Sequence, residues 1–348
     1  MRTTFNLQKL IRPNIAALKP YSSARDEFTN ASENMIFLDA NENPFENGVN
    51  RYPDPQQRIL KKRLSELKNI PTDQILLGNG SDEVLDLIFR AFCEPGKDSI
   101  ITLPPTYGMY SVLAGINAVQ NKEVLLTPNF ELNIAAIKNA FDLHTKVLFL
   151  CMPNNPTGNI FSEKDVIELV KSFSGLVVID EAYIDFSTQN SWISKIVDYP
   201  NLIVTQTVSK AYGMAGIRLG ICYASSEIIT VLNKIKPPYN INELTQQKAL
   251  ERLEDVANIK TEINSINEEK RYLSKALLDI DWIMKIYPSE ANFLLIKVDD
   301  ADKRYQELIA NKVVIRNRSS QPLCNNTLRL TIGTKEENKR LIKAFKAL

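Results

Sequence analysis

Short apolar runs separated by amphipathic stretches are the feature of this sequence that most restricts its fold. Seven such runs lie between residues 75 and 223, and each is apolar along its length rather than at alternate positions. A strand with this pattern is covered on both faces, which is typical of a parallel sheet between layers of helices. The expected strands are 75–77, 99–103, 123–126, 146–150, 176–179, 202–205 and 219–223. The expected helices between them are 55–67, 81–92, 107–115, 132–140 and 163–173.

This alternation predicts an α/β fold with a mostly parallel sheet sandwiched by helices. The pattern changes after residue 239, because 242–279 is helical almost throughout and is long enough to be broken or to bridge two domains. A smaller α+β unit follows, and we expect the N-terminal segment to pack against it. Its expected strands are 282–286, 293–297, 313–315 and 327–331, with helices at 302–311 and 335–347. We therefore predict a large domain at 46–245 and a small domain made of 1–45 and 246–348.

The composition argues against several classes of function. The 348 residues include 42 Lys and Arg and 41 Asp and Glu, so the net charge of +1 favours neither nucleic acid nor a membrane surface. No apolar run approaches the roughly 20 residues that span a bilayer. The single histidine, His144, argues against most zinc sites and against a Ser-His-Asp triad. The four cysteines lack a C-x-x-C spacing, which indicates reduced core residues and a cytoplasmic location.

Two residues at the ends of expected strands carry the first chemical signal. Lys210 follows the apolar run 202–204, so we expect it at the end of a buried strand rather than on a solvated helix. Burial disfavours a charged ammonium, and a neutral lysine amine can form a Schiff base. Asp180 ends the run 176–179 and is expected at the carboxyl edge of the sheet, where α/β folds bind ligands. A carboxylate there keeps a ring nitrogen protonated, although Asp180 is also suited to capping the following turn.

Further polar residues suit the other parts of a phosphorylated ring. Asn155 and Tyr183 offer hydrogen bonds to a ring oxygen, although 154–158 is in any case a turn. The stretch 78–83 follows a strand and opens a helix, where free amides bind phosphate. The carboxylate of Asp82 would repel phosphate, so we expect it to cap the helix and to contact phosphate through its backbone amide. The remaining expected phosphate contacts are Ser81, Thr207, Ser209 and Arg218.

An asparagine, an aspartate, a tyrosine, a lysine and an arginine, in this order along the chain, are the set needed to hold pyridoxal phosphate. Tyr107 could stack on its ring, although an aromatic residue in a Pro/Gly loop more often serves packing. Arg329 lies between apolar residues of a strand, where a cation is costly unless it meets an anion. We favour substrate binding over a structural ion pair for Arg329, and leave both open for Arg316.

Taken together, these motifs resemble the fold-type I pyridoxal-phosphate enzymes of the aspartate aminotransferase superfamily. Within it they are most similar to the histidinol-phosphate aminotransferases. The first 25 residues are basic, as in a transit peptide, but the family has its own N-terminal arm at this place. The similar stretches are 18–25, 38–44, 51–55, 79–83, 105–110, 180–186, 207–218 and 328–334.

The resemblance implies a role for each matched residue. Lys210 would bind the cofactor and shuttle the proton, Asp180 would pair with the ring nitrogen, and Tyr183 would donate to the ring oxygen together with Asn155. Tyr52 would reach the cofactor phosphate of a neighbouring subunit, which implies a homodimer with shared sites. Tyr107 would stack on the ring, and Ser81, Asp82, Thr207, Ser209 and Arg218 would contact the phosphate. The substrate pocket would contain Arg329, Arg316, Tyr21 and Asn41.

Two positions depart from the family pattern. Ile221 stands where an aromatic residue is usual, which we interpret as a packing difference. Asn317 stands where an aspartate usually follows the arginine, so Arg316 lacks an acidic neighbour in sequence.

The implied activity is a ping-pong transfer of the amino group between glutamate and imidazole-acetol phosphate, giving 2-oxoglutarate and histidinol phosphate, a step of histidine biosynthesis. Two enzymes of the same superfamily remain as alternatives, a threonine-phosphate decarboxylase and a broad aromatic aminotransferase. A cofactor-sensing transcription regulator is the alternative from another class. We expect no such regulator, because the fold begins near the N-terminus and the chain has no basic excess.

Overall fold

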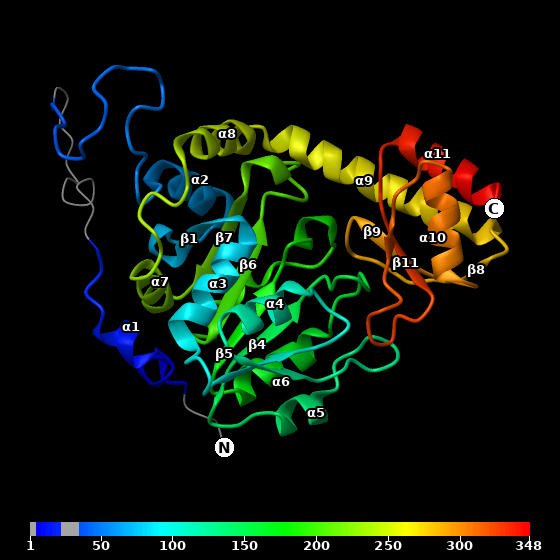
Figure 1. Cartoon of the computed structure of the whole chain (residues 1–348), viewed down its shortest axis with the longest axis horizontal. Coiled ribbons are helices and arrows are strands. Elements are labelled where there is room, and N and C mark those ends of the chain that lie inside the picture. Colours follow the sequence, from blue (N-terminus) through cyan, green and yellow to red (C-terminus); the bar gives the residue numbers. More distant parts are fainter. Residues whose placement is uncertain (1–4, 22–34) are drawn as a thin grey trace.

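The computed structural model of the chain describes residues 5–21 and 35–348, and it contains a large and a small unit (Figure 1). The sheet of the large unit has seven strands in the order β1-β7-β6-β5-β4-β2-β3. Strands β3, β2, β4, β5 and β6 pair in parallel, whereas β7 is antiparallel to both β6 and β1. The strands are β1 (Ile75–Asn79), β2 (Ser99–Thr102), β3 (Gln120–Glu123), β4 (Thr145–Cys151), β5 (Leu176–Asp180), β6 (Leu202–Thr207) and β7 (Leu219–Ala224). The predicted α/β class with a mostly parallel sheet is confirmed.

Each central strand supplies both cores of the large unit, because successive side chains point to opposite faces. On β5, Val177 belongs to one buried cluster and Val178 to the other. Helices cover both faces, which explains why the strands are apolar along their whole length. The helices of this unit are α2 (Arg58–Lys68), α3 (Gly80–Phe92), α4 (Met109–Ile116), α5 (Ile134–Asn139), α6 (Glu163–Ser172), α7 (Ser226–Asn233) and α8 (Glu243–Glu254).

The small unit has a four-stranded antiparallel sheet in the order β10-β11-β9-β8. Its strands are β8 (Ile283–Ile286), β9 (Phe293–Val298), β10 (Arg316–Asn317) and β11 (Thr327–Thr331). Helices α10 (Ala301–Ala310) and α11 (Lys335–Lys346) belong to it. Its core contains Leu294 of β9 and Phe345 of α11, together with Leu273 at the end of the long helix α9 (Val256–Ala276).

The expected helix 242–279 is broken at Asp255, which separates α8 from α9. The Asp255 side chain accepts a hydrogen bond from the amide of Asn258 and so caps α9. In Figure 1, α9 runs from the large unit to the small unit, as expected for a bridging helix. Short 3₁₀ helices are η1 (Leu7–Lys9), η2 (Thr72–Gln74), η3 (Ile184–Phe186), η4 (Trp192–Lys195), η5 (Ala215–Ile217) and η6 (Leu277–Asp279).

Two expected strands are wrong in position. Strand β3 spans 120–123 rather than 123–126, and β10 spans 316–317 rather than 313–315. Both lie at the edge of their sheets with one neighbour each, and neither has a buried residue. An edge strand exposed to solvent does not require apolar side chains, so its position is poorly marked in the sequence.

Residues 5–17 pack against the large unit and not against the small one. The amide of Arg12 donates to the carbonyl of Ala91 at 3.0 Å, and its side chain pairs with Glu94 at 3.2 Å. Ile15 of α1 (Pro13–Ala17) lies in the cluster beneath α3. The expected contact of the N-terminal segment with the small unit is therefore wrong for this stretch, and the domain boundaries stay a prediction. Residues 22–25, part of one family-like stretch, lie outside the described residues.

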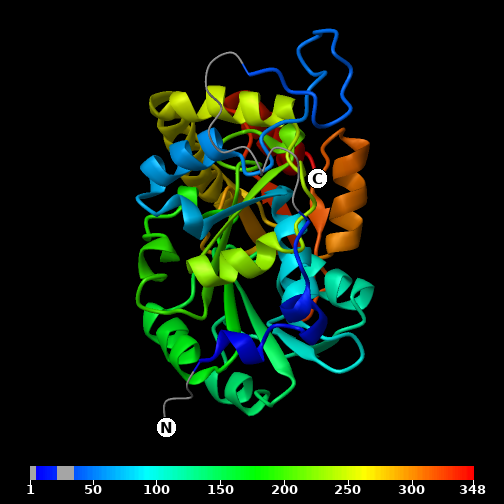
Figure 2. The same ribbon diagram turned by 90° about the vertical axis from the view of Figure 1, so that its left-hand side faces the viewer.

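The segment that begins at residue 35 projects away from the rest of the large unit before it reaches α2, as Figures 1 and 2 show. The four cysteines are free and buried, in agreement with the expected core positions. Within residues 5–21 and 35–348, no helix is both long and apolar enough to cross a membrane.

Candidate active site

A cavity of about 180 Å³ lies where β4, β5 and β6 end. This is the carboxyl edge of the parallel strands, where α/β folds bind their ligands. Its walls come from distant parts of the chain and include ten of the predicted cofactor-binding residues. The lining residues are Ser81, Asp82, Tyr107, Cys151, Asn155, Asp180, Ala182, Tyr183, Thr207, Ser209, Lys210, Ala215 and Arg218.

Lys210 follows β6 and extends into this cavity. Its Nζ lies 5.8 Å from the centroid of the Tyr183 ring. The Lys210 side chain is exposed to solvent in part, but partial burial lowers the pKa of its ammonium, and the nearby guanidinium groups of Arg329 and Arg218 lower it further. In the described part of the chain, no carboxylate lies within the 4.0 Å of an ion pair with this amine. The surroundings therefore favour a neutral, nucleophilic lysine.

Asp180 is buried at the end of β5, and its two oxygens have different partners. Oδ1 accepts a hydrogen bond from the amide of Ala182 at 3.2 Å, so the capping role considered for this residue is real. Oδ2 accepts a hydrogen bond from the hydroxyl of Tyr110 at 2.7 Å. Burial raises the pKa of Asp180 to about 6, even though both hydrogen bonds lower it. The two hydrogen bonds therefore fix the position of the buried carboxyl group, and a positively charged ligand beside it would stabilise its ionised form.

Tyr110 is a residue that the sequence interpretation missed. It lies on α4 and is fully buried, and its ring stacks on Phe149 at 4.7 Å between centroids. An available signal was its position three residues after Tyr107, one helical turn along the chain. Because most buried tyrosines serve packing, the sequence gives no reason to connect Tyr110 with Asp180.

The turn from β1 into α3 forms another wall of the cavity, through Ser81 and Asp82. The amide of Gly80 donates to the carbonyl of Arg218 at 2.8 Å, which joins this turn to the segment after Lys210. A Cβ on Gly220 would lie 2.2 Å from the backbone nitrogen of Ser81, so only glycine allows this approach. The first turn of α3 therefore presents its free amides beside Arg218, an arrangement suited to phosphate.

The expected capping role of Asp82 is wrong. Its carboxylate accepts a hydrogen bond from the Tyr107 hydroxyl at 3.0 Å and lies 3.8 Å from Nη2 of Arg218. Glu83 instead reaches back to the start of the helix, where its Oε2 accepts from the amide of Asn79 at 2.5 Å. The difference arises because the side chain at residue 82 faces the cavity, where a tyrosine and an arginine are available.

Arg329 on β11 connects the small unit to the cavity. Its Nη1 donates to Oδ1 of Asn155 at 2.5 Å, and its guanidinium carbon lies 5.2 Å from the Phe293 ring centroid. The alternative of a structural ion pair is not found, since no described carboxylate lies within 4.0 Å of it. Its partner across β10 and β11 is Arg316, which is exposed. Asn317, the departure from the family pattern, donates instead to Asp302 at 2.6 Å.

Five predicted residues do not line the cavity. Arg316 and Arg329 line a groove of about 550 Å³ on the small unit, and the other three are Tyr52, Asn41 and Tyr21. Tyr52 and Asn41 line a separate groove of about 430 Å³ beside 242–244, and Tyr52 stacks on Tyr239 at 4.4 Å. Tyr21 is exposed. A single chain therefore does not bring Tyr52, Asn41 or Tyr21 to Lys210.

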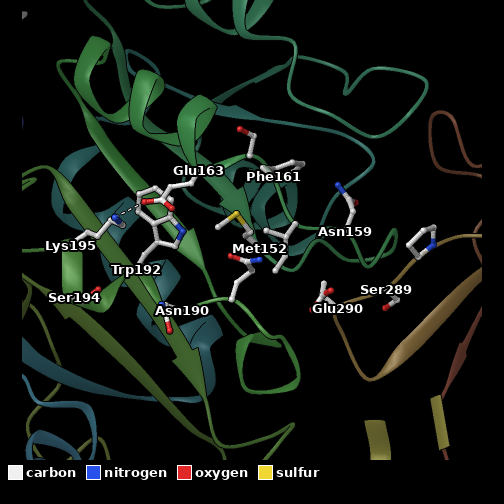
Figure 3. Close-up of a pocket in the computed structure, with 14 residues that line it drawn as sticks. Met152, Asn159, Phe161, Glu163, Asn190, Trp192, Ser194, Lys195, Ser289 and Glu290 are labelled. Atoms are coloured by element: carbon white, nitrogen blue, oxygen red, sulfur yellow. Dashed lines mark ion pairs between the residues drawn. The ribbon is translucent and has the colours of Figure 1, made fainter. Parts of the chain in front are cut away.

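A larger cavity of about 540 Å³ lies between the two units (Figure 3). It is lined by parts of 152–163 and 189–195 from the large unit and by 288–290 from the small unit. Lys195 and Glu163 form an ion pair in its wall at 2.5 Å. None of the predicted site residues lines it, so the smaller cavity around Lys210 is the better candidate for the reaction site.

Residues 35–345 match the family of class I and II aminotransferases. The chain belongs to this family. It is 64% identical to the histidinol-phosphate aminotransferase of Flavobacterium johnsoniae over 99% of both chains. It is 61% identical to that of Christiangramia forsetii over 99% of this chain and 98% of the relative.

Among solved structures, the aminotransferase fold of this chain resembles the histidinol-phosphate aminotransferase of Clostridium acetobutylicum. The TM-score is 0.80 at 25% identity, and the match covers 86% of this chain and 90% of that one. The fold and the superfamily predicted from the motifs are both confirmed.

Proposed function

We propose that the chain is a pyridoxal-phosphate-dependent aminotransferase of histidine biosynthesis. It would convert histidinol phosphate and 2-oxoglutarate into imidazole-acetol phosphate and glutamate, and the reverse. The observation that carries this proposal is one cavity that joins the partly desolvated Lys210, the buried Asp180 and the turn into α3. The choice of substrates rests on the relative that is 64% identical over 99% of both chains and is named for this activity.

The residues of the cavity fit pyridoxal phosphate. Asp180 is a buried anion that suits a protonated ring nitrogen, and the amides of α3 with Arg218 suit a phosphate. Because Oδ1 of Asn155 already accepts from Arg329, its Nδ2 remains as a donor toward a ring oxygen. The other residues assigned to the cofactor are Ser81, Asp82, Thr207, Ser209, Tyr183 and, stacked on the ring, Tyr107.

Bound pyridoxal phosphate supplies an aldehyde that takes the amino group and a ring that accepts the electrons of the broken C–H bond. The amine of Lys210 takes the proton from the substrate carbon and returns it, for which its lowered pKa suits it. The Asp180 carboxylate holds a proton at the ring nitrogen. Burial raises the pKa of the Tyr183 hydroxyl, so it stays protonated and donates a hydrogen bond.

Arg329 would bind the anionic end of each substrate in turn, because glutamate and histidinol phosphate are both anions. Arg316 lies at the exposed side of the same strand pair. One arginine site that serves two anions is consistent with a ping-pong reaction, in which one substrate leaves before the other binds.

A second copy of the chain would complete the site in a cytoplasmic homodimer. Ile36, Leu38 and Phe45 on the projecting segment are 84%, 85% and 80% exposed, which favours cover by another chain. Tyr52 from one copy would then reach the cofactor phosphate of the other, with Tyr21 and Asn41 near the substrate. A mixture of Lys210→Ala and Tyr52→Phe chains tests this arrangement. Mixed dimers should exceed the mean activity of the two parents, and activity that only averages the parents would refute sharing.

The activity is tested with purified holoenzyme, histidinol phosphate and 2-oxoglutarate, with phenylalanine as a competing donor. Glutamate should convert the cofactor to its amine form, and Lys210→Ala should lose both the visible absorbance and the borohydride-trapped adduct. Release of carbon dioxide from threonine phosphate would instead identify the decarboxylase. Faster turnover of phenylalanine than of histidinol phosphate would identify the broad aromatic enzyme.

A further inference from the structure

Three arginines lie on one face of the small sheet, beside the cavity. Arg316 and Arg329 are direct partners in the pairing of β10 with β11, so their side chains share a face. The backbone continues this pairing, because the amide of Arg318 donates to the carbonyl of Thr327 at 2.9 Å. Arg318 is two residues beyond Arg316, which returns its side chain to the same face.

This face is the one directed at the large unit. Leu295, the partner of Arg329 on β9, packs in the main apolar cluster of the large unit. The charge of Arg318 acts on the Tyr183 hydroxyl, and the charges of Arg329 and Arg316 lower the pKa of Arg318. The Arg318 guanidinium is therefore close to a wall of the cavity, although the sequence interpretation did not include it.

The three guanidinium groups have no counter-anion in the part of the chain that the structure describes. No carboxylate there lies within 4.0 Å of Arg316, Arg318 or Arg329. The Nε atoms of Arg318 and Arg329 are both buried without a hydrogen-bond partner among these residues. Like charges opposite one another on a sheet repel, and a buried donor without a partner is destabilising. Burial, followed by the two neighbouring arginines, lowers the pKa of Arg318 to about 10.

An arrangement of this kind is explained by a ligand with more than one negative charge. A carboxylate has a single charge and two oxygens, which one arginine satisfies through two parallel hydrogen bonds. A phosphate ester carries about 1.5 to 2 charges at pH 7 and has three strongly accepting oxygens. Glutamate has two carboxylates, but three carbon atoms separate them, so only one of them can lie at Arg329. A second inward-facing arginine beside Arg329 is therefore surplus for that carboxylate and appropriate for a phosphate.

Building on the function proposed above, we propose that Arg318 is a specificity-determining residue that binds the substrate phosphate together with Arg329. Arg316 contributes charge at the exposed rim. This pair selects an amino phosphate over amino acids with an uncharged or singly charged side chain. The glutamate carboxylate at this site needs only Arg329, so the two half-reactions depend differently on Arg318.

The test compares Arg318→Gln and Arg318→Lys holoenzymes with the wild type in separate half-reactions. Arg318→Gln should lower kcat/KM for histidinol phosphate by about 10- to 100-fold, the range for loss of a hydrogen bond between charged groups. It should lower kcat/KM for glutamate by less than about threefold. Arg318→Lys retains the charge without the planar fork, so it should recover part of the phosphate preference. Arg271→Gln on α9, an exposed arginine of the same region, should change neither value.

An equal loss for both substrates, or no loss for either, would overturn the role of Arg318. Thermal unfolding shows whether Arg318→Gln is correctly folded. Its melting temperature should not be lower than that of the wild type, because the substitution removes an unpaired buried cation. A wild type that does not use histidinol phosphate would refute the proposed function and not the arginine site. In that case, inhibition of the glutamate half-reaction by inorganic phosphate tests whether Arg318 binds phosphate. Arg318→Gln should weaken this inhibition, and Arg271→Gln should not. Equal inhibition of all three proteins would refute it.

Discussion

The hydrogen bond from Tyr110 to Asp180 gives a prediction that distinguishes chemistry from packing. Tyr110→Phe removes one hydroxyl and leaves the ring, which is fully buried and stacked on Phe149. The hydroxyl that is removed donates a hydrogen bond of 2.7 Å to Oδ2 of Asp180, a buried and ionisable acceptor. Such bonds contribute about 1.5–3 kcal/mol. The variant should therefore fold and bind cofactor, but its Asp180 should be harder to ionise.

The size of the effect follows from the relation between free energy and pKa. One pKa unit corresponds to about 1.36 kcal/mol, so loss of the bond raises the pKa of Asp180 by about one to two units. Burial has already raised that pKa to about 6. A protonated ring nitrogen bound beside Asp180, as proposed, would lower the pKa in both proteins, so the difference between them would remain. The acid limb of the kcat/KM profile should move upward by about one to two pH units in Tyr110→Phe.

The assay is kcat/KM for glutamate from pH 5 to 9, with the visible spectrum of the holoenzyme recorded at each pH. Activity of the variant should approach that of the wild type at high pH and fall below it near neutrality. Phe149→Leu is the matched control, because it disturbs the same ring stack without touching the carboxyl. It should lower stability and leave the acid limb in place. A Tyr110→Phe profile that is uniformly lower, with the same limb as the wild type, would refute the reasoning.

Two further predictions concern buried groups next to the site. Glu181 is fully buried and accepts hydrogen bonds from Ser191, Trp192 and Gln206, and burial raises its pKa to about 7. Between the unfolded pKa and this value the folded state binds more protons, so the free energy of unfolding should fall as pH rises. From pH 4.5 to 7, the free energy of unfolding of the wild type should fall by about 3 kcal/mol more than that of Glu181→Gln, as measured by urea unfolding. The same dependence on pH in both proteins would contradict this prediction. Gly220→Ala should lower the free energy of unfolding by about 1–3 kcal/mol and weaken cofactor binding, because its Cβ would lie 2.2 Å from the backbone nitrogen of Ser81. Gly216→Ala is the control, because a Cβ at that position would meet nothing within 4 Å. Thermal unfolding and titration with pyridoxal phosphate measure both, and equal behaviour of the two variants would exclude the close approach as the cause.

The central part of the fold was predictable because burial on both faces leaves a continuous apolar run. Val177 and Val178 are adjacent in sequence and enter different cores, which no solvent-exposed strand allows. The direction of a buried strand leaves no comparable pattern in the sequence. The antiparallel orientation of β7 between β1 and β6 was therefore not predicted. The N-terminal segment shows a related limit. The apolar spacing of Leu7, Ile11 and Ile15 indicates a buried face, but it does not say which surface accepts it.

The site was predictable where a residue ends a strand or opens a helix. Asp180 and Lys210 lie at or just beyond the ends of apolar strands, and parallel strands end at one edge of a sheet. Arg318 was missed because it follows a strand of only two residues, Arg316–Asn317, in a polar stretch without an apolar period. The role proposed for Arg318 depends on the pairing of its segment with β11, which brings Arg318 near Arg329. Such a contact between residues distant in sequence is not visible in composition or spacing.

Two hydrogen bonds of different kinds join the two units at the loop that carries Asn155. The amide of Glu290 donates to the carbonyl of Gly158 at 2.7 Å, while Nη1 of Arg329 donates to Oδ1 of Asn155 at 2.5 Å. The first bond joins backbone to backbone and is independent of ligand. The second uses the arginine that we propose binds the substrate anion, so that anion would have to compete with a neutral amide oxygen. A charged acceptor forms the stronger bond, which favours the exchange. On this proposal, substrate binding would free Oδ1 of Asn155 while the backbone hydrogen bond still holds the loop in place.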